Sequence, residues 1–104
     1  MLCRVEHTPY VEEVLRAVES IPRGKVMSYG DVAELVGEGG PRQVGRVMAE
    51  YGGGVPWWRV IRTSGIPAPE VALEAIPRLI ADGTPMRADG HGVDMRRARW
   101  AGPD

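Results

Sequence analysis

One thiol and two imidazoles are the side chains of this chain best suited to nucleophilic or general-base chemistry. They belong to Cys3, His7 and His91, and none of them lies in a recognisable catalytic motif. Thiol chemistry requires a thiolate that a neighbouring base activates, and Cys3 stands near the start of the chain without such a context. We therefore expect an inert cysteine and surface histidines. The sequence also has no metal-ligand cluster, phosphate-binding loop or catalytic triad, so it predicts neither a cofactor nor a metal site.

Three other stretches carry more information about function. Residues 28–33 read SYGDVA, residues 41–48 read PRQVGRVM, and residues 54–61 read GVPWWRVI. In this order and spacing they resemble the O6-alkylguanine-DNA alkyltransferase family, which has a P-C-H-R-V active-site motif preceded by a helix-turn-helix. The resemblance covers about residues 9–100.

Two tryptophans stand at the reactive positions of that motif. Trp57 takes the position of the nucleophilic cysteine, and Trp58 takes the position of the histidine. The chain is therefore most similar to the alkyltransferase-like proteins, which keep the fold and replace the cysteine, often by tryptophan. Because indole offers no comparable nucleophile and cannot act as a base, we expect no alkyl transfer and no enzymatic activity.

The resemblance implies DNA binding through the minor groove, with the second helix of the helix-turn-helix inserted and the damaged guanine flipped into a pocket. Arg42 matches the finger residue that fills the gap left by the flipped base. Tyr29 matches the tyrosine that contacts the phosphate next to the target. Gly45 and Ala49 are small enough for this helix to approach the DNA closely. The residues expected to bind DNA are Tyr29, Pro41, Arg42, Gln43, Gly45 and Arg46.

The resemblance also implies a lesion pocket. Trp57 is expected to meet the O6-alkyl group with an aromatic face, and Arg59 to tie the loop down. Trp58 is expected to pack in the core behind the pocket. Asp82 falls where the family has the acidic partner of the histidine, and we expect it to cap or brace a loop. The expected pocket residues are Tyr29, Val55, Pro56, Trp57, Trp58 and Arg59.

Helical periodicity and capping signals predict the elements that position these residues. An amphipathic helix is expected over residues 9–20, and a second helix from the N-cap Ser28, with Val32, Leu35 and Val36 inward, to the glycines that follow. A third helix is expected over residues 41–51, followed by a flexible glycine hinge. A helix over residues 71–82 should break at Pro77. The tail is expected to form a short closing strand and an anchor at Trp100.

Composition sets the broad class. The chain has 104 residues, of which 43% are hydrophobic and 26% charged, so it predicts one globular domain over residues 1–104. With the resemblance, we expect a mainly helical fold with a few short strands, a winged-helix-like helix-turn-helix of the alkyltransferase DNA-binding type. The sequence has no apolar run of membrane-spanning length and no secretory signal, and its single cysteine fits a cytoplasmic, nucleoid-associated protein.

A net charge of −1 indicates few phosphate contacts and modest affinity for undamaged DNA. The leading hypothesis is a monomeric, non-enzymatic sensor of O6-alkylguanine in double-stranded DNA. The resemblance implies that it passes the lesion to nucleotide excision repair through UvrA. One alternative is a winged-helix transcription regulator that reads the major groove without a lesion preference. Another is an inhibitor that shields lesions from true alkyltransferases.

Overall fold

The computed structural model describes residues 8–103, and Cys3 and His7 therefore lie outside the described part. The elements follow in the order α1 (Pro9–Glu19), β1 (Met27–Ser28), α2 (Tyr29–Val36), α3 (Pro41–Tyr51), η1 (Gly52–Gly54), η2 (Trp57–Arg59), β2 (Val60–Ile61), η3 (Pro69–Val71), α4 (Ala72–Ala81) and α5 (Met95–Ala98). The expected mainly helical fold with short strands is confirmed. Within residues 8–103, no helix is long and apolar enough to cross a membrane.

The first three helices begin and end at the residues that the capping signals predict. The side chain of Thr8 accepts a hydrogen bond from Val11 N at the start of α1. At the start of α2, Ser28 Oγ accepts from Asp31 N at 3.0 Å, and Asp31 accepts from Ser28 N at 3.2 Å. This reciprocal capping box satisfies two amides that the helix leaves unpaired. Gly37, with φ of +92°, ends α2 in the left-handed region.

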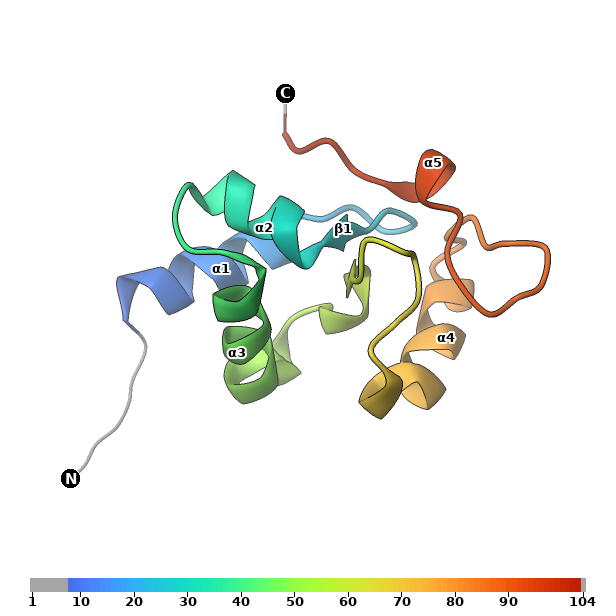
Figure 1. Ribbon diagram of the computed structural model, residues 1–104, viewed down its shortest axis with the longest axis horizontal. Helices are drawn as coiled ribbons and strands as arrows, with labels where there is room; N and C mark the ends of the chain where they lie inside the picture. Colours follow the sequence, from blue (N-terminus) through green and yellow to red (C-terminus); the bar gives the residue numbers. More distant parts are fainter. Residues whose placement is uncertain (1–7, 104) are drawn as a thin grey trace.

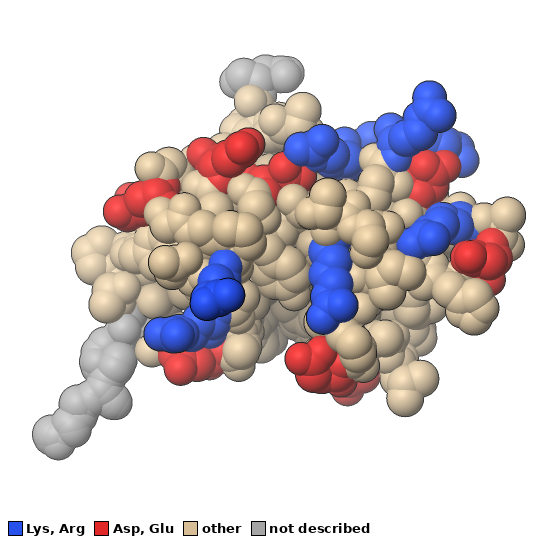
Figure 2. Space-filling model, in the orientation of Figure 1, with Lys and Arg blue, Asp and Glu red and all other residues tan. Residues whose placement is uncertain are grey.

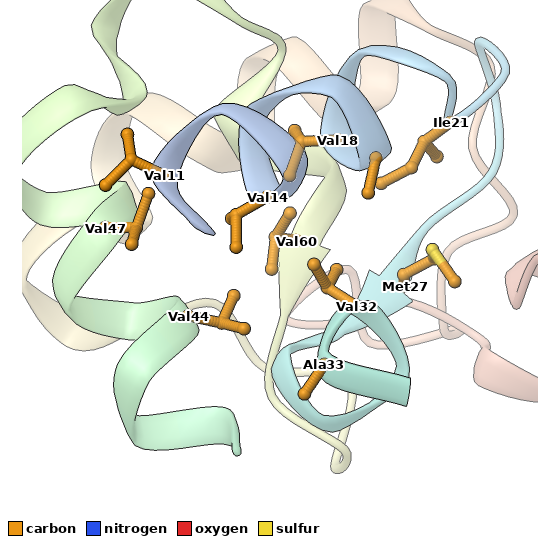
Figure 3. Packing of buried hydrophobic residues seen from close by; sticks show 11 residues of the cluster. Val11, Val14, Val18, Ile21, Met27, Val32, Ala33, Val44, Val47 and Val60 are labelled. Atoms are coloured by element: carbon orange, nitrogen blue, oxygen red, sulfur yellow. The ribbon is translucent and has the colours of Figure 1, made fainter. Parts of the chain in front are cut away.

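Helices α1, α2 and α3 enclose the larger hydrophobic core. Figure 3 shows Val11, Val14 and Val18 of α1 pointing toward side chains of the other two helices and of β2. Val32, Val44 and Val60, which face α1, are almost fully buried. The buried residues of this cluster are Val11, Val14, Ala17, Val18, Ile21, Met27, Val32, Ala33, Val44, Val47 and Val60. Burial of these aliphatic groups stabilises the arrangement of α2 and α3 on α1.

A short parallel pairing joins the helical part to the rest of the chain. Met27 and Ser28 of β1 pair with Val60 and Ile61 of β2. Figure 1 shows α3 on one side of this pairing and α4 on the other, with residues 52–68 between them. A smaller core, formed by Val26, Ile61, Leu79, Val93 and Ala98, holds α4 and the C-terminal segment in place.

Two local predictions were wrong, and a third segment has a structure that the sequence did not indicate. The helix α4 continues through Pro77. Pro77 has no N–H to donate to the backbone carbonyl of Leu73, but both residues lie on the exposed face of the helix, where water can hydrate that carbonyl. The tail forms the short helix α5 and an isolated bridge between Val26 and Arg99 in place of a strand. The hinge residues 52–54 form the 3-10 helix η1.

Two expectations about apolar side chains had different outcomes. Leu35 is 37% exposed because Val32 and Ala33 take the inward face of α2. Trp100 packs against the larger core, as expected, and its backbone N–H donates to the carbonyl oxygen of Val26 at 2.8 Å.

Candidate nucleic-acid interface

The helix α3 has one buried face and one open face. Val44 and Val47 are buried in the core, whereas Arg42 and Arg46 are exposed. Gly45 also lies toward the open side, since no atom would be within 4 Å of a Cβ added there. The open face therefore has room for a second molecule to approach the helix backbone.

A groove of about 750 Å³ runs from this face of α3 to η3 and α4. Figure 2 shows a hollow between these helices, with separate basic and acidic side chains around it instead of one continuous basic surface. The groove is lined by Tyr29, Pro41, Arg42, Gly45, Met48, Ala49, Gly52, Gly53, Trp57, Trp58, Val60, Ile61, Arg62, Pro67, Ala68, Glu70, Val71, Glu74 and Ala75. Its size and mixed apolar and polar lining are those of a small-ligand site.

The structure brings together part of the predicted site. Six of the predicted residues line the groove, namely Tyr29, Pro41, Arg42, Gly45, Trp57 and Trp58. Five do not, namely Gln43, Arg46, Val55, Pro56 and Arg59. The oxygen of the Gln43 side chain accepts a hydrogen bond from Gly40 N at 3.0 Å and so closes the N-terminus of α3.

The two tryptophans form one wall of the groove. Their rings meet edge to face, with centroids 5.8 Å apart and an interplanar angle of 87°. The guanidinium of Arg78, on α4, lies 5.7 Å from the Trp57 centroid and 5.2 Å from the Trp58 centroid. Aromatic edge contacts and cation–π contacts both favour a fixed ring orientation. Arg78 of α4 therefore helps to fix the orientation of both rings.

Asp82 fastens this wall to the end of α4. The guanidinium of Arg59 donates two hydrogen bonds to the Asp82 carboxylate, at 2.8 and 3.2 Å, and a third to Ile21 O at 3.1 Å. Trp58 Nε1 donates to the same carboxylate at 2.9 Å. Burial disfavours the charged form of Asp82, but the hydrogen bonds from Arg59 and Trp58 outweigh it and lower its pKa. Through these contacts Arg59 and Asp82 brace the loop that carries Trp57 against the end of α4.

Trp58 combines two roles. It packs against the smaller core, as expected, and it also lines the groove.

Tyr29 stands at the first position of α2, where its ring is half-buried beside the groove. Burial raises the pKa of its hydroxyl, the charge of Glu70 raises it further, and Arg62 partly opposes them. The hydroxyl is thus a neutral hydrogen-bond donor at physiological pH, as a contact to a phosphate oxygen requires.

Sequence reasoning missed the opposite wall of the groove. Glu70 and Glu74, with the apolar Val71 and Ala75, line it from η3 and α4. Arg78 was missed as well. The helical spacing of these residues predicts which of them are buried, but it does not indicate which exposed ones face α3.

Of the three side chains best suited to nucleophilic or general-base chemistry, only His91 lies within the described residues. His91 is exposed, as expected. Within residues 8–103, no group of three or more His, Cys, Asp or Glu residues could hold a metal ion.

Comparison with known proteins identifies the fold. A family model described as "6-O-methylguanine DNA methyltransferase, DNA binding domain" matches residues 9–80. The chain belongs to this family. Among its relatives, a "DNA base-flipping protein" of Escherichia coli (strain K12) is 34% identical over 97 residues, which span 88% of this chain and 74% of the relative. A protein of the same name from Shigella flexneri has the same identity and coverage.

Solved structures of the family agree with this assignment. The crystal structure of S. pombe Atl1 in complex with damaged DNA containing O6-carboxymethylguanine is similar to this chain, with a TM-score of 0.75 and 30% identity over 88% of this chain and 94% of Atl1. A second crystal structure, of S. pombe ATL in complex with DNA, gives a TM-score of 0.74 with the same identity and coverage. The described fold is therefore that of a DNA-binding domain of the alkyltransferase family.

Proposed function

We propose that this chain binds O6-alkylguanine in duplex DNA and rotates the modified base out of the helix into the groove between α3 and α4. The observation that carries the proposal is the continuity of this groove. It joins the exposed face of α3, which includes Arg42 and Gly45, to the aromatic wall of Trp57. A helix that enters the minor groove of DNA would thus stand directly beside a pocket for an extruded base.

The residues along the groove suit the separate steps of base extrusion. Gly45 lets the helix backbone approach the minor groove, and Arg42 can occupy the place that the base leaves. Tyr29 can donate a hydrogen bond to the phosphate beside the target. Extrusion of a base costs a few kcal/mol, and stacking of the base and its alkyl group on Trp57 offsets that cost.

The binding we propose is not followed by alkyl transfer. Trp57 and Trp58 stand where the family motif has its cysteine and histidine, and an indole has no thiolate to attack the alkyl carbon. Trp57→Cys alone should restore little transfer, because the histidine is also missing. We propose that the bound lesion is instead passed to nucleotide excision repair, through UvrA, in the cytoplasm at the nucleoid.

A competition experiment tests this function against that of a sequence-reading regulator. A labelled duplex with one O6-methylguanine is competed with the same sequence undamaged and with an unrelated sequence that carries the lesion. The lesion in the unrelated sequence should compete strongly, and the undamaged duplex should compete weakly. The reverse order would overturn the proposal and favour the regulator.

A further inference from the structure

Two carboxylates stand on the wall of the groove that faces α3. Glu70 lies on η3 and Glu74 on α4, and both are exposed at the groove. The residues around them on this wall are apolar, including Val71 and Ala75. Within residues 8–103, neither carboxylate forms an ion pair or accepts a hydrogen bond. This wall therefore presents negative charge without a neutralising partner in contact.

The cations of the groove come from other elements. Arg42 belongs to α3, and Arg62 follows β2. Arg62 and Glu70 both act on the Tyr29 hydroxyl, with opposite effects, so Arg62 offsets Glu70 in part. Arg78 follows Glu74 by one turn of α4, but its guanidinium lies over the tryptophan rings and it does not line the groove. No positively charged residue lines the groove on the wall that carries Glu74, so the charge of Glu74 is not offset there.

We propose that Glu70 and Glu74 make the groove select by charge among O6-alkyl adducts, disfavouring those that end in a carboxylate and accepting neutral adducts of the same size. The inference rests on the proposed function, because it assumes that the extruded base reaches this groove. The carboxylate of such an adduct is repelled by the two unpaired carboxylates of Glu70 and Glu74 in a partly desolvated site. It also loses hydrogen bonds to water, for which the site offers no substitute. A neutral amide of the same shape avoids the repulsion.

The test compares two adducts that differ in charge and little in shape. Duplexes of one sequence carry O6-carboxymethylguanine, O6-carbamoylmethylguanine or guanine, and each is titrated with the protein. At low salt the carbamoylmethyl duplex should bind roughly fivefold or more tighter than the carboxymethyl duplex, which is the scale of a screened charge pair a few ångströms apart. The ratio should fall as salt is added.

Neutral variants of the wall show whether its carboxylates cause the difference. Glu70→Gln and Glu74→Gln should each reduce the ratio, and the double variant should bring it near one, because affinity for the carboxymethyl duplex should rise more than affinity for the carbamoylmethyl duplex. The control is Glu13→Gln, at an exposed position of α1 that does not line the groove, which should keep the wild-type ratio.

Three results would count against the inference, and they are distinguishable. Equal affinity of the wild-type protein for the two adducts, with both preferred over guanine, overturns charge selection and leaves the proposed function standing. A ratio that persists in the double variant assigns the selection to other groups. If neither adduct binds more tightly than guanine, the proposed function itself fails, and the inference fails with it.

Discussion

The indole Nε1 of Trp58 donates a hydrogen bond of 2.9 Å to the carboxylate of Asp82, 24 residues further along the chain. The same carboxylate accepts two hydrogen bonds from Arg59. One acidic side chain thus fixes two consecutive residues of the motif that carries Trp57. Because the orientation of that ring defines one wall of the groove, the Asp82 cluster links the stability of the fold to the geometry of the proposed lesion site.

Loss of the Asp82 carboxylate should destabilise the protein. The Asp82 side chain is 7% exposed and that of Arg59 is 15% exposed. Asp82→Ala therefore leaves the indole N–H of Trp58 without its acceptor and a largely buried guanidinium without its carboxylate, with only the hydrogen bond to Ile21 O retained. We expect the free energy of unfolding to fall by about 3 kcal/mol, as for other broken buried ion pairs. Urea unfolding followed by tryptophan fluorescence measures the change.

Arg23 provides the matched control for that measurement. It also approaches Asp82, at 3.5 Å, but its side chain is 73% exposed. Arg23→Met should therefore lower the free energy of unfolding by less than about 0.5 kcal/mol. Equal losses for Asp82→Ala and Arg23→Met would contradict the distinction between the buried and the exposed partner.

Stability should decrease in acid through two aspartates. Hydrogen bonds from Arg99 lower the pKa of Asp31 in the folded protein, and the pKa of Asp82 is also lowered. A carboxyl whose folded pKa lies below its unfolded value of about 3.9 stabilises the fold above that pH, and this stabilisation is lost as the pH falls toward the folded pKa. We expect the urea midpoint to drop below about pH 5.

The variant Asp31→Asn isolates one of these contributions. Its free energy of unfolding should be lower than that of the wild type at neutral pH, because the ion pair with Arg99 is lost and the neutral amide oxygen is a weaker acceptor for Ser28 N. Its decline in acid should be shallower. Parallel pH curves for the two proteins would show that Asp31 does not contribute to acid sensitivity.

Substitutions of Gly45 should change DNA affinity and the free energy of unfolding independently of each other. A Cβ at this position meets no atom within 4 Å, and glycine inside a helix is destabilising, so Gly45→Ala should raise the free energy of unfolding by about 0.5–1 kcal/mol. Gly45→Leu should fold equally well but lower DNA affinity by more than about tenfold, or 1.4 kcal/mol, because its side chain blocks the approach of α3.

Leucine at an exposed position of another helix serves as the comparison. Glu13→Leu adds a similar side chain to α1, away from the groove, and should leave DNA affinity unchanged. Calorimetry or fluorescence anisotropy measures both variants. Wild-type DNA affinity in Gly45→Leu would exclude the open face of α3 as the binding surface.

The two exposed arginines of α3 should behave differently. Arg42 lines the groove and Arg46 does not. Arg42→Ala should reduce the preference for a duplex with O6-methylguanine by about tenfold, because nothing then fills the place of the extruded base. Arg46→Ala should weaken binding to damaged and undamaged duplexes by the same factor. It should also reduce the slope of log affinity against log salt concentration by about one, which corresponds to the loss of one phosphate contact. An equal loss of lesion preference in both variants would contradict the role proposed for Arg42.

Local signals made the first half of the fold predictable. Ser28 with Asp31, and the valines of α1 and α3, are capping and periodicity features that act within a few residues, so they specify a helix without knowledge of the rest of the chain. Pro77 misled because its effect depends on exposure: on a solvated face the unpaired carbonyl of Leu73 costs little.

The site was predictable only where a motif carries it. Trp57, Arg42 and Tyr29 follow from a resemblance, and the structure places them along one groove. The contacts of Asp82 with Arg59 and Trp58 join residues 23 and 24 positions apart, and no periodicity encodes such a pairing. In the sequence, Glu70 and Glu74 are indistinguishable from ordinary exposed helix residues, and only the packing of η3 and α4 against the rest of the fold places them at the groove.

If Trp57 lies in the site that reads the lesion, removal of its ring should abolish most of the discrimination between damaged and undamaged DNA. The dissociation constants of the wild-type protein and of Trp57→Ala are determined on a duplex with a single O6-methylguanine and on its undamaged twin, at moderate salt. We predict that the wild type prefers the damaged duplex by about tenfold or more, equivalent to 1.4 kcal/mol, and that Trp57→Ala loses most of this preference. Equal affinity of the wild-type protein for the two duplexes, or an unchanged preference for the damaged duplex in Trp57→Ala, would contradict this role of Trp57.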